Sequence, residues 1–225
     1  MAPDSPADAG DADASVGGGS STSSFKVYTR TGDGGTSCLF NMERRDKDDV
    51  AFEALGDVDE LGVAVGLADA HALAEVARNP TAVARADLER LSKRLREIQS
   101  RLLDVGSAVA TPLAGDASSE WKKSRAAFSD SHVDALESWI DEYDESLPPL
   151  KTFILPGGGI VAAHLHHARV VARRAERRCV PMVRAEDCPP EVTKYLNRLS
   201  DFLYTAARFA AMRTGEEETP YRKPD

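Results

Sequence analysis

The residue types best suited to chemistry are arginines that recur at helical spacing between residues 157 and 182. At about 100° per residue, one arc of this segment collects Ala162, His166, Arg169, Arg173, Glu176 and Arg177. Like charges three or four residues apart repel one another unless an anion or a carboxylate neutralises them. A guanidinium group also presents a planar fork that matches phosphate oxygens. The arc therefore predicts either an ordinary solvated helix face or a binding site for a polyphosphate.

A glycine-rich stretch from Lys26 to Phe40, KVYTRTGDGGTSCLF, is a second candidate for anion binding. Exposed backbone N–H groups among small residues can form a cradle for an oxyanion. The same residues also favour a plain hairpin, with Asp33 and Gly34 as its turn and residues 27–29 as one arm. The stretch has neither the G-K-[ST] ending of a Walker loop nor the G-x-G-x-x-G pattern. Local sequence leaves both interpretations open.

A polar stripe also marks the last helical segment, where Asn197, Asp201, Tyr204 and Arg208 share one face. Asn197 could donate and accept hydrogen bonds at a nucleotide or its ribose, and Asp201 could hold an arginine in place. Ordinary hydrogen bonding between helices explains the same stripe equally well.

Asp59 presents a similar choice in the first helical segment. It shares a stripe with Leu55, Gly62 and Gly66, and the glycines would permit another helix to approach closely. The carboxylate could form a salt bridge to an arginine of another subunit, or it could be a simple surface group.

Two other kinds of site are discounted. His164, His166 and His167 resemble a metal cluster, but only His164 and His167 approach one face, and no Glu-x-x-His pair accompanies them. We therefore predict no metal held by histidine. The chain also has no G-x-S-x-G elbow, so a hydrolase triad would have no anchor.

Hydrophobic periodicity predicts five helices that would position these residues. Four are long, at residues 50–78, 84–110, 157–182 and 190–214, and a shorter one spans residues 130–146. Residues 112–128 are expected to form a polar connection. The glycine-rich segment 153–159 leads into the helix at residues 157–182, which is the fourth in chain order. The predicted inward face of that helix consists of Val161, Leu165, Ala168, Ala172, Ala175 and Cys179. The predicted fold class is all-α, an up-and-down bundle of about five helices with a short N-terminal Gly-rich hairpin or loop.

Composition limits the domain count and the class of partner. A chain of 225 residues favours one domain, which we place at residues 25–214. Residues 1–24 are expected to be a disordered acidic Gly/Ser-rich tail, and residues 215–225 a C-terminal tail. The formal net charge of −9 argues against a general nucleic-acid binder, so an anion site must be a local cluster of arginines.

The cellular compartment is constrained by the cysteines and by hydropathy. Cys38, Cys179 and Cys188 form no C-x-x-C pair, and their odd number gives no disulfide framework. A reducing compartment fits best, namely the cytoplasm, or the mitochondrial matrix in a eukaryote. No apolar run approaches the roughly 20 residues of a membrane span, so no membrane partner is expected.

Six motifs together resemble the PduO-type ATP:corrinoid adenosyltransferases. They are YTRTGDGGTSCLF at 28–40, ERRDKDD at 43–49, EALGDVDEL at 53–61, FILPGG at 153–158, ARVVARRAERR at 168–178 and YLNRLSDFLY at 195–204. The resemblance extends from Lys26 to about Arg213. It implies a homotrimer of helix bundles with active sites between neighbouring subunits, where the N-terminal loop folds over ATP. A turn and a cradle would then be the same loop.

The resemblance assigns roles motif by motif. The nucleotide loop would comprise Thr29, Arg30, Thr31, Gly32, Ser37 and Cys38, followed by the phosphate-facing Lys47. The ATP-binding part of the helices would comprise Arg173, Arg174, Glu176, Arg177 and Asn197, although Arg174 lies off the arginine arc. Asp59 and Arg169 would link subunits beside the site, and Phe153 would lie at the lower face of the corrinoid. The chain departs from the common pattern at Gly34, where lysine is frequent, and at Cys38, where serine is usual.

The implied reaction is transfer of the 5′-deoxyadenosyl group of ATP to the cobalt of cob(I)alamin, which releases triphosphate. Arginines and Mg²⁺ would stabilise the leaving triphosphate. Phe153 would exclude the lower axial ligand and so favour four-coordinate Co(II), which is easier to reduce. A corrinoid reductase and an adenosylcobalamin-dependent enzyme are implied as partners. The alternatives are a non-catalytic ATP-binding corrinoid chaperone or regulator, and a structural module whose arginines meet an acidic protein.

Overall fold

A computed structural model describes residues 28–79, 81–114 and 119–223. The tail predicted at residues 1–24 lies outside this part of the chain, so the predicted domain limits stay predictions. Six α-helices account for most of the described residues: α1 (Val50–Arg78), α2 (Ala82–Val109), α3 (Glu120–Arg125), α4 (Ser131–Asp144), α5 (Gly159–Arg184) and α6 (Pro190–Thr214). The predicted all-α bundle is confirmed.

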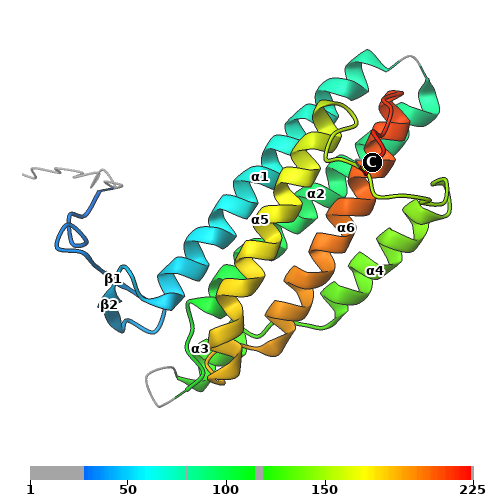
Figure 1. Ribbon diagram of the computed structural model, residues 1–225. Coiled ribbons are helices and arrows are strands. Elements are labelled where there is room, and N and C mark those ends of the chain that lie inside the picture. Colours follow the sequence, from blue (N-terminus) through cyan, green and yellow to red (C-terminus); the bar gives the residue numbers. More distant parts are fainter. Residues whose placement is uncertain (1–27, 80, 115–118, 224–225) are drawn as a thin grey trace, which may run out of the picture.

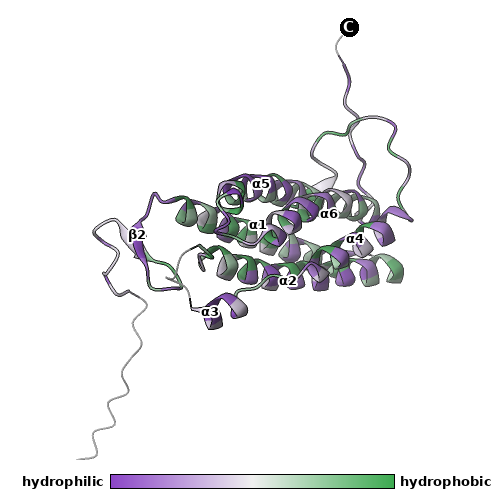
Figure 2. Cartoon of the chain, turned by 90° about the horizontal axis from the view of Figure 1, so that it is seen from below, coloured by the Kyte–Doolittle hydropathy of each residue, from purple (hydrophilic) through white to green (hydrophobic). Residues whose placement is uncertain are grey.

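The long helices lie side by side as an up-and-down bundle (Figure 1). α5 packs between α1 and α6, while α2 packs against α1 and α4 against α6. Each long helix carries both hydrophobic and hydrophilic residues (Figure 2), as an element with one buried face must. Within the described residues, none of the helices is long and apolar enough to cross a bilayer.

Capping residues explain where the first two helices begin. The Asp49 side chain accepts a hydrogen bond from the backbone N–H of Ala51 at 2.8 Å. The Thr81 hydroxyl accepts one from Ala84 N at 3.3 Å. Both side chains satisfy N–H groups that have no partner inside the helix. The predicted bounds of α1 and α6 are confirmed, and α2 begins two residues earlier than predicted.

The buried core matches the predicted apolar faces. On α2, the seam formed by Leu88, Leu91, Leu95, Ile98, Leu102 and Val105 is buried. All six residues predicted to face inward on α5 are also buried. Tyr195, Leu199, Phe202, Ala206 and Phe209 complete the core from α6. The predicted arginine arc lies beside this inward face of α5, about 110° around the helix. Its Ala162 and His166 are buried, whereas its Arg173 and Arg177 are exposed.

The N-terminal hairpin is displaced from the predicted one. Strands β1 (Thr36–Cys38) and β2 (Arg44–Asp46) pair antiparallel, with Ser37 opposite Arg45. Their connection is residues 39–43, where the Asn41 side chain accepts from Glu43 N at 2.9 Å and stabilises the turn. Asp33 and Gly34 do form a turn, but it precedes β1. The predicted arm at residues 27–29 was wrong for 28 and 29, and Val27 lies outside the described residues.

Two segments expected to be irregular contain ordered structure. The polar connection at 112–128 includes α3, whose Lys122 Nζ donates to the carbonyl of Phe40 at 3.0 Å. Residues of the predicted C-terminal tail pair with the loop before α5, because Ile154 and Pro220 form an antiparallel bridge. Periodicity could not reveal either, since α3 is short and the C-terminal segment has no helical or strand pattern.

Candidate active site

The arginines of α5 divide between two faces of the helix. Arg174 Nε lies 3.0 Å from Asp57 Oδ1, and Arg174 also pairs with Glu60. Arg178 Nη2 lies 2.9 Å from Glu53 Oε2. These carboxylates belong to α1, so Arg174 and Arg178 join the two helices. Arg174 thus has partners within its own chain, and its assignment to ATP stays a prediction.

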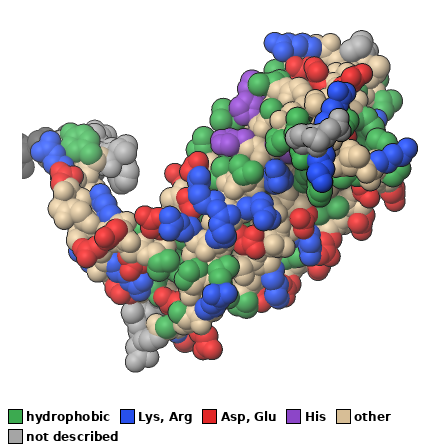
Figure 3. All heavy atoms as spheres, viewed as in Figure 1, with side chains coloured by type: hydrophobic (Ala, Val, Ile, Leu, Met, Phe, Trp, Pro, Cys, Tyr) green, Lys and Arg blue, Asp and Glu red, His purple; other side chains and the backbone are tan. Residues whose placement is uncertain are grey.

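Arg169, Arg173 and Arg177 lie on the other face, which is directed toward α6; we call them the guanidinium stripe. In the described part of the chain, no carboxylate lies within ion-pair distance of any of the three. Arg177 Nη1 donates to the carbonyl of Arg173 at 3.1 Å, and Arg173 is exposed. Figure 3 shows Lys and Arg side chains gathered over the middle of α5. The predicted arc thus presents positive charge at its arginines, while its Ala162 and His166 are buried.

Arg169 is the most enclosed member of the stripe. Its Nε is buried and has no hydrogen-bond partner among the described residues. Its guanidinium carbon lies 6.0 Å from the centroid of the Tyr204 ring on α6. A buried donor without an acceptor is unfavourable, so this group is suited to an acceptor from outside the chain.

Glu176 and Asn197 connect the stripe to α6. Asn197 Nδ2 donates to Glu176 Oε1 at 3.0 Å, and Asn197 is exposed. Asp201 pairs with Arg198 Nη1 at 2.9 Å, within α6. The sequence indicated that Asp201 could hold an arginine in place. It does so, but the arginine is Arg198 of the same helix. The arrangement presents one amide and one carboxylate beside three guanidinium groups.

His166 is adjacent to the stripe but contributes no charge at neutral pH. It is buried, and its ring lies 5.9 Å from the Tyr204 ring. Burial, followed by the positive charge of Arg169, lowers the pKa of His166 to about 4. In the described residues, no group of three or more His, Cys, Asp or Glu side chains is arranged to hold a metal ion.

The N-terminal turn contains a second group of cations. The hydroxyls of Thr29 and Thr31 lie 2.9 Å apart, and the Arg30 guanidinium lies 5.6 Å from the Tyr28 ring centroid. A Cβ built on Gly32 would lie 3.3 Å from Lys47 Nζ, so the ammonium group is next to this glycine. Ser37 and Cys38 follow in β1, the first half-buried and the second exposed.

Arg44 is a binding candidate that the sequence did not reveal. From β2 its Nε donates to the Thr36 hydroxyl at 2.8 Å, its Nη2 to the carbonyl of Thr31, and its Nη1 to Cys38 Sγ at 3.4 Å. It lies within the ERRDKDD motif, but only the strand register places it opposite Cys38. With Arg30 and Lys47, it surrounds the turn with positive charge.

The two positive regions are separate in one chain. The turn and hairpin project from one end of the bundle, whereas the guanidinium stripe follows α5 (Figure 1). No hydrogen bond or ion pair among the described residues joins positions 29–38 to α5 or α6. A site that uses both regions would need the turn of one chain to meet the stripe of another.

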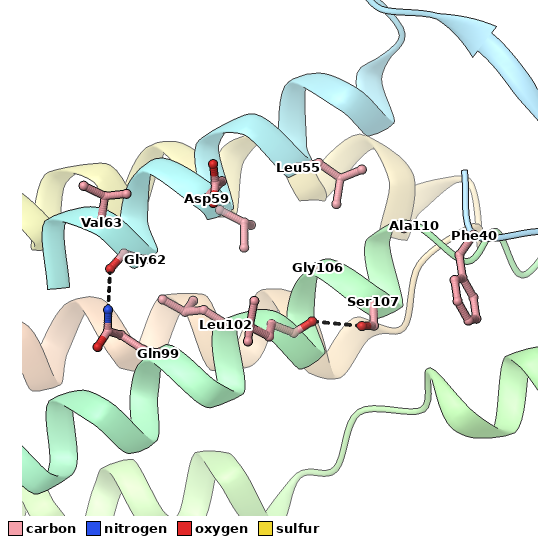
Figure 4. A pocket seen from close by; sticks show the side chains of 12 residues that line it. Phe40, Leu55, Asp59, Gly62, Val63, Gln99, Leu102, Gly106, Ser107 and Ala110 are labelled. Atoms are coloured by element: carbon pink, nitrogen blue, oxygen red, sulfur yellow. Dashed lines mark hydrogen bonds between the residues drawn. The ribbon is translucent and has the colours of Figure 1, made fainter. Parts of the chain in front are cut away.

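Asp59 lines a groove on the outer side of α1 and α2. The groove has a volume of about 600 Å³, and its lining includes Phe40, Val63 and Leu103, which are all exposed (Figure 4). Asp59 has no ion-pair partner within the described chain and does not contact Arg169. The predicted pair of Asp59 and Arg169 is therefore not formed inside one subunit and stays a prediction about two.

Phe153 lies on the loop before α5 and is 81% exposed. Its carbonyl accepts a hydrogen bond from Tyr221 N at 2.7 Å. At about 1.5 Å per residue, the start of α5 is about 21 Å from Arg173 along the helix axis. Phe153 and the guanidinium stripe therefore lie at different levels along α5 within one chain.

Comparisons with known proteins agree with this arrangement. A profile of the cobalamin adenosyltransferase family matches residues 27–210. The chain is 46% identical over 206 residues to corrinoid adenosyltransferase MMAB of Mus musculus, which covers 89% of this chain and 78% of that protein. It is 38% identical over 199 residues to the corrinoid adenosyltransferase of Bacillus subtilis strain 168, which covers 88% and 93%.

The fold has counterparts among solved structures. A variant PduO-type ATP:corrinoid adenosyltransferase from Lactobacillus reuteri, complexed with cobalamin and ATP, superposes with a TM-score of 0.75 and 34% identity. The match covers 88% of this chain and 100% of that chain. A second variant of that enzyme, complexed with ATP, gives a TM-score of 0.72 and 33% identity. The family profile, the relatives and the shared fold agree with the six sequence motifs, and the chain belongs to the cobalamin adenosyltransferase family.

Proposed function

We propose that this chain transfers the 5′-deoxyadenosyl group of ATP to the cobalt of cob(I)alamin. The nucleophilic Co(I) centre attacks C5′, a Co–C bond forms with both electrons from cobalt, and the C5′–O bond breaks to release triphosphate. The reaction requires no general base, so the protein's task is to position two substrates and to neutralise charge. The names of the relatives and the ATP and cobalamin in the Lactobacillus reuteri complex support this assignment.

The observation that carries the proposal is the guanidinium stripe without carboxylate partners. Arg174 and Arg178, each one residue further along, are neutralised by α1, whereas Arg173 and Arg177 are not. Triphosphate gains negative charge as it leaves, and fixed cations near its oxygens stabilise that transition state. We assign Arg173 and Arg177 to the triphosphate, and Glu176 and Asn197 to the nucleoside.

We further propose that the active site is formed between copies of the chain in a homotrimer. Asp59 on the α1–α2 groove and Arg169 on the α5–α6 face are opposite charges that form no ion pair among the described residues. Pairing across copies would satisfy the buried Arg169 Nε and cover the apolar wall of the groove. It would also bring Thr29, Arg30, Thr31, Gly32, Ser37, Cys38 and Lys47 of one copy to the stripe of the next.

We propose that Mg²⁺ binds to this protein as part of the MgATP complex. In the described chain no cluster of acidic or histidine side chains fits a resident metal, and the one carboxylate on the stripe, Glu176, accepts from Asn197. Mg²⁺ retains water and binds phosphate oxygens readily. We therefore treat it as part of the ATP substrate, held by phosphates rather than by the protein.

Phe153 is proposed to lie against the lower face of the corrinoid. A ring that is 81% exposed is available for contact with a large planar substrate. An apolar group there would exclude the lower axial ligand and favour four-coordinate Co(II). The Co(I) state requires a reductase, and the product would pass to an adenosylcobalamin-dependent enzyme. The three free thiols are compatible with a reducing cytoplasm or mitochondrial matrix.

The test is a mixture of the protein, MgATP and chemically reduced cobalamin, in which loss of the cob(I)alamin absorbance and release of triphosphate are followed together. We expect one triphosphate for each adenosylcobalamin formed. ATP binding without triphosphate release would instead indicate a corrinoid chaperone or regulator. Absence of any ATP-dependent thermal stabilisation would refute the nucleotide site itself.

A further inference from the structure

The C-terminal segment is paired with the loop that carries Phe153. Leu155 N donates to the carbonyl of Thr219 at 2.8 Å, and Tyr221 N donates to the carbonyl of Phe153 at 2.7 Å. Between these bonds, Ile154 and Pro220 form an antiparallel bridge. Figures 1 and 2 both place the C-terminal segment beside this loop. Residues 216–221, which we call the strap, therefore fix the backbone of Phe153.

The glycines at the start of α5 leave room for the strap. Gly158 and Gly159 have φ values of +83° and +82°, a conformation that side chains rarely adopt. A Cβ on Gly158 would lie 2.8 Å from the Cβ of Ala211, and one on Gly159 would lie 2.6 Å from the Cγ of Glu216. This glycine-rich break thus accommodates the end of α6 and the strap of the same chain.

Arg208 holds the strap from inside the bundle. Its side chain is 6% exposed, and its Nε lies 3.1 Å from Glu218 Oε1. Its Nη2 donates to the carbonyl of Pro148 at 2.8 Å. One buried guanidinium therefore joins α6, the chain before the Phe153 loop, and the strap. Removing the carboxylate would leave a buried charge without a counterion, which is strongly unfavourable.

We propose that Arg208 and Glu218 are positioning residues for the corrinoid half of the site. The Phe153 ring is largely exposed, so side-chain packing does little to fix it, and its place depends on the backbone bonds to the strap. Those bonds persist only while the strap stays in place, and the ion pair holds it there. This inference rests on the proposed function and on the role proposed for Phe153.

The test compares Glu218→Gln with Glu217→Gln in the full chain. Glu218→Gln keeps the shape but removes the charge that faces Arg208, whereas Glu217 is exposed and serves as a matched control. If the freed loop holds Phe153 correctly about a tenth of the time, the apparent affinity for the corrinoid falls about tenfold. We expect a roughly tenfold rise in KM for cob(I)alamin and loss of the four-coordinate cob(II)alamin spectrum, with KM for ATP unchanged. Glu218→Asp keeps the negative charge, so it should partly restore both the KM for cob(I)alamin and the four-coordinate spectrum.

A second readout does not depend on activity. Hydrogen exchange at the amides of Leu155 and Tyr221 should be slow in the wild type and in Glu217→Gln, but fast in Glu218→Gln. If the wild type turns over and Glu218→Gln matches it in KM, spectrum and exchange, the proposal is overturned. Equal damage to the ATP and corrinoid constants would also overturn it, because the pair would then be merely structural. A wild type that transfers no adenosyl group would refute the proposed function, while exchange would still show whether the strap is held by Glu218.

Discussion

Replacing Arg173 with alanine should separate the chemistry of the guanidinium stripe from the stability of the fold. Arg173 is exposed and has no carboxylate partner among the described residues, so its removal should change the free energy of unfolding by less than about 0.5 kcal/mol. If it meets the leaving triphosphate, its loss removes one fixed donor from the transition state. Such a donor is worth about 3 to 4 kcal/mol, or roughly 10²–10³-fold in kcat. We therefore expect a folded protein that is almost inactive.

The same helix provides the control. Arg178 Nη2 pairs with Glu53 Oε2 at 2.9 Å on the face toward α1, and both side chains are about half exposed. Arg178→Ala should therefore lose less than about 1 kcal/mol of stability and little activity. Arg173→Lys keeps the charge but not the planar fork, so its loss of kcat should be smaller than that of Arg173→Ala but still measurable.

The assay is the single-turnover rate of adenosylcobalamin formation at saturating MgATP, measured beside thermal unfolding and light scattering. A rate for Arg173→Ala within a few-fold of the wild type would contradict the proposed role of the stripe. So would an equal loss in Arg178→Ala, because the effect would then follow the charge of α5 as a whole. Full activity in Arg173→Lys would contradict the argument from the planar fork.

Three further predictions concern other parts of the surface. Phe153→Ala should bind ATP normally but lose the four-coordinate cob(II)alamin spectrum; an unchanged spectrum would refute the role of the ring. Asp59→Lys would place a positive charge against Arg169 of another copy, so light scattering should show that the trimer dissociates. Glu89→Lys, an exposed change on α2, should not cause dissociation. A trimer that survives Asp59→Lys would rule out the pair. His166 has a pKa lowered to about 4 in the fold, so the unfolded chain binds more protons below pH 6.5, and the fold should lose up to about 3 kcal/mol between pH 6.5 and 4. Urea titrations at several pH values should show a weaker pH dependence in His166→Gln, and identical curves would show that His166 does not contribute.

The helices and the stripe could be predicted because their signals are local. Apolar residues at helical spacing, with proline or glycine near the ends, located α1 and α6 to within about one residue at each end. The same angular periodicity separated the buried face of α5 from Arg169, Arg173 and Arg177. Local residue spacing contains enough information to assign residues to a helix face, whatever that face later contacts.

The contacts that could not be predicted depend on which elements become neighbours. Arg44 reaches Cys38 and Thr36 only because β1 and β2 pair in one register. The turn of a hairpin sets the register of its strands, and the turn predicted from the sequence was at Asp33 and Gly34, so this register could not be predicted. The strap, residues 216–221, has no helical or strand periodicity in its sequence. Its hydrogen bonds to the Phe153 loop through Thr219 and Tyr221 could therefore not be inferred. The partners of Arg174 could not be inferred either, because they required knowing that α1 packs beside α5.

The arginine doublets of α5 show how one short motif can serve two purposes. In each of the pairs Arg173–Arg174 and Arg177–Arg178, the second residue is rotated by about 100° from the first. The second residue of each pair meets carboxylates of α1, and the first meets none within the described chain. Neutralising one member of each doublet halves the unpaired charge of the two doublets without filling the sites that an anion would occupy. A stripe built without that compensation would repel itself more strongly, and α5 would then be less stable in the absence of nucleotide.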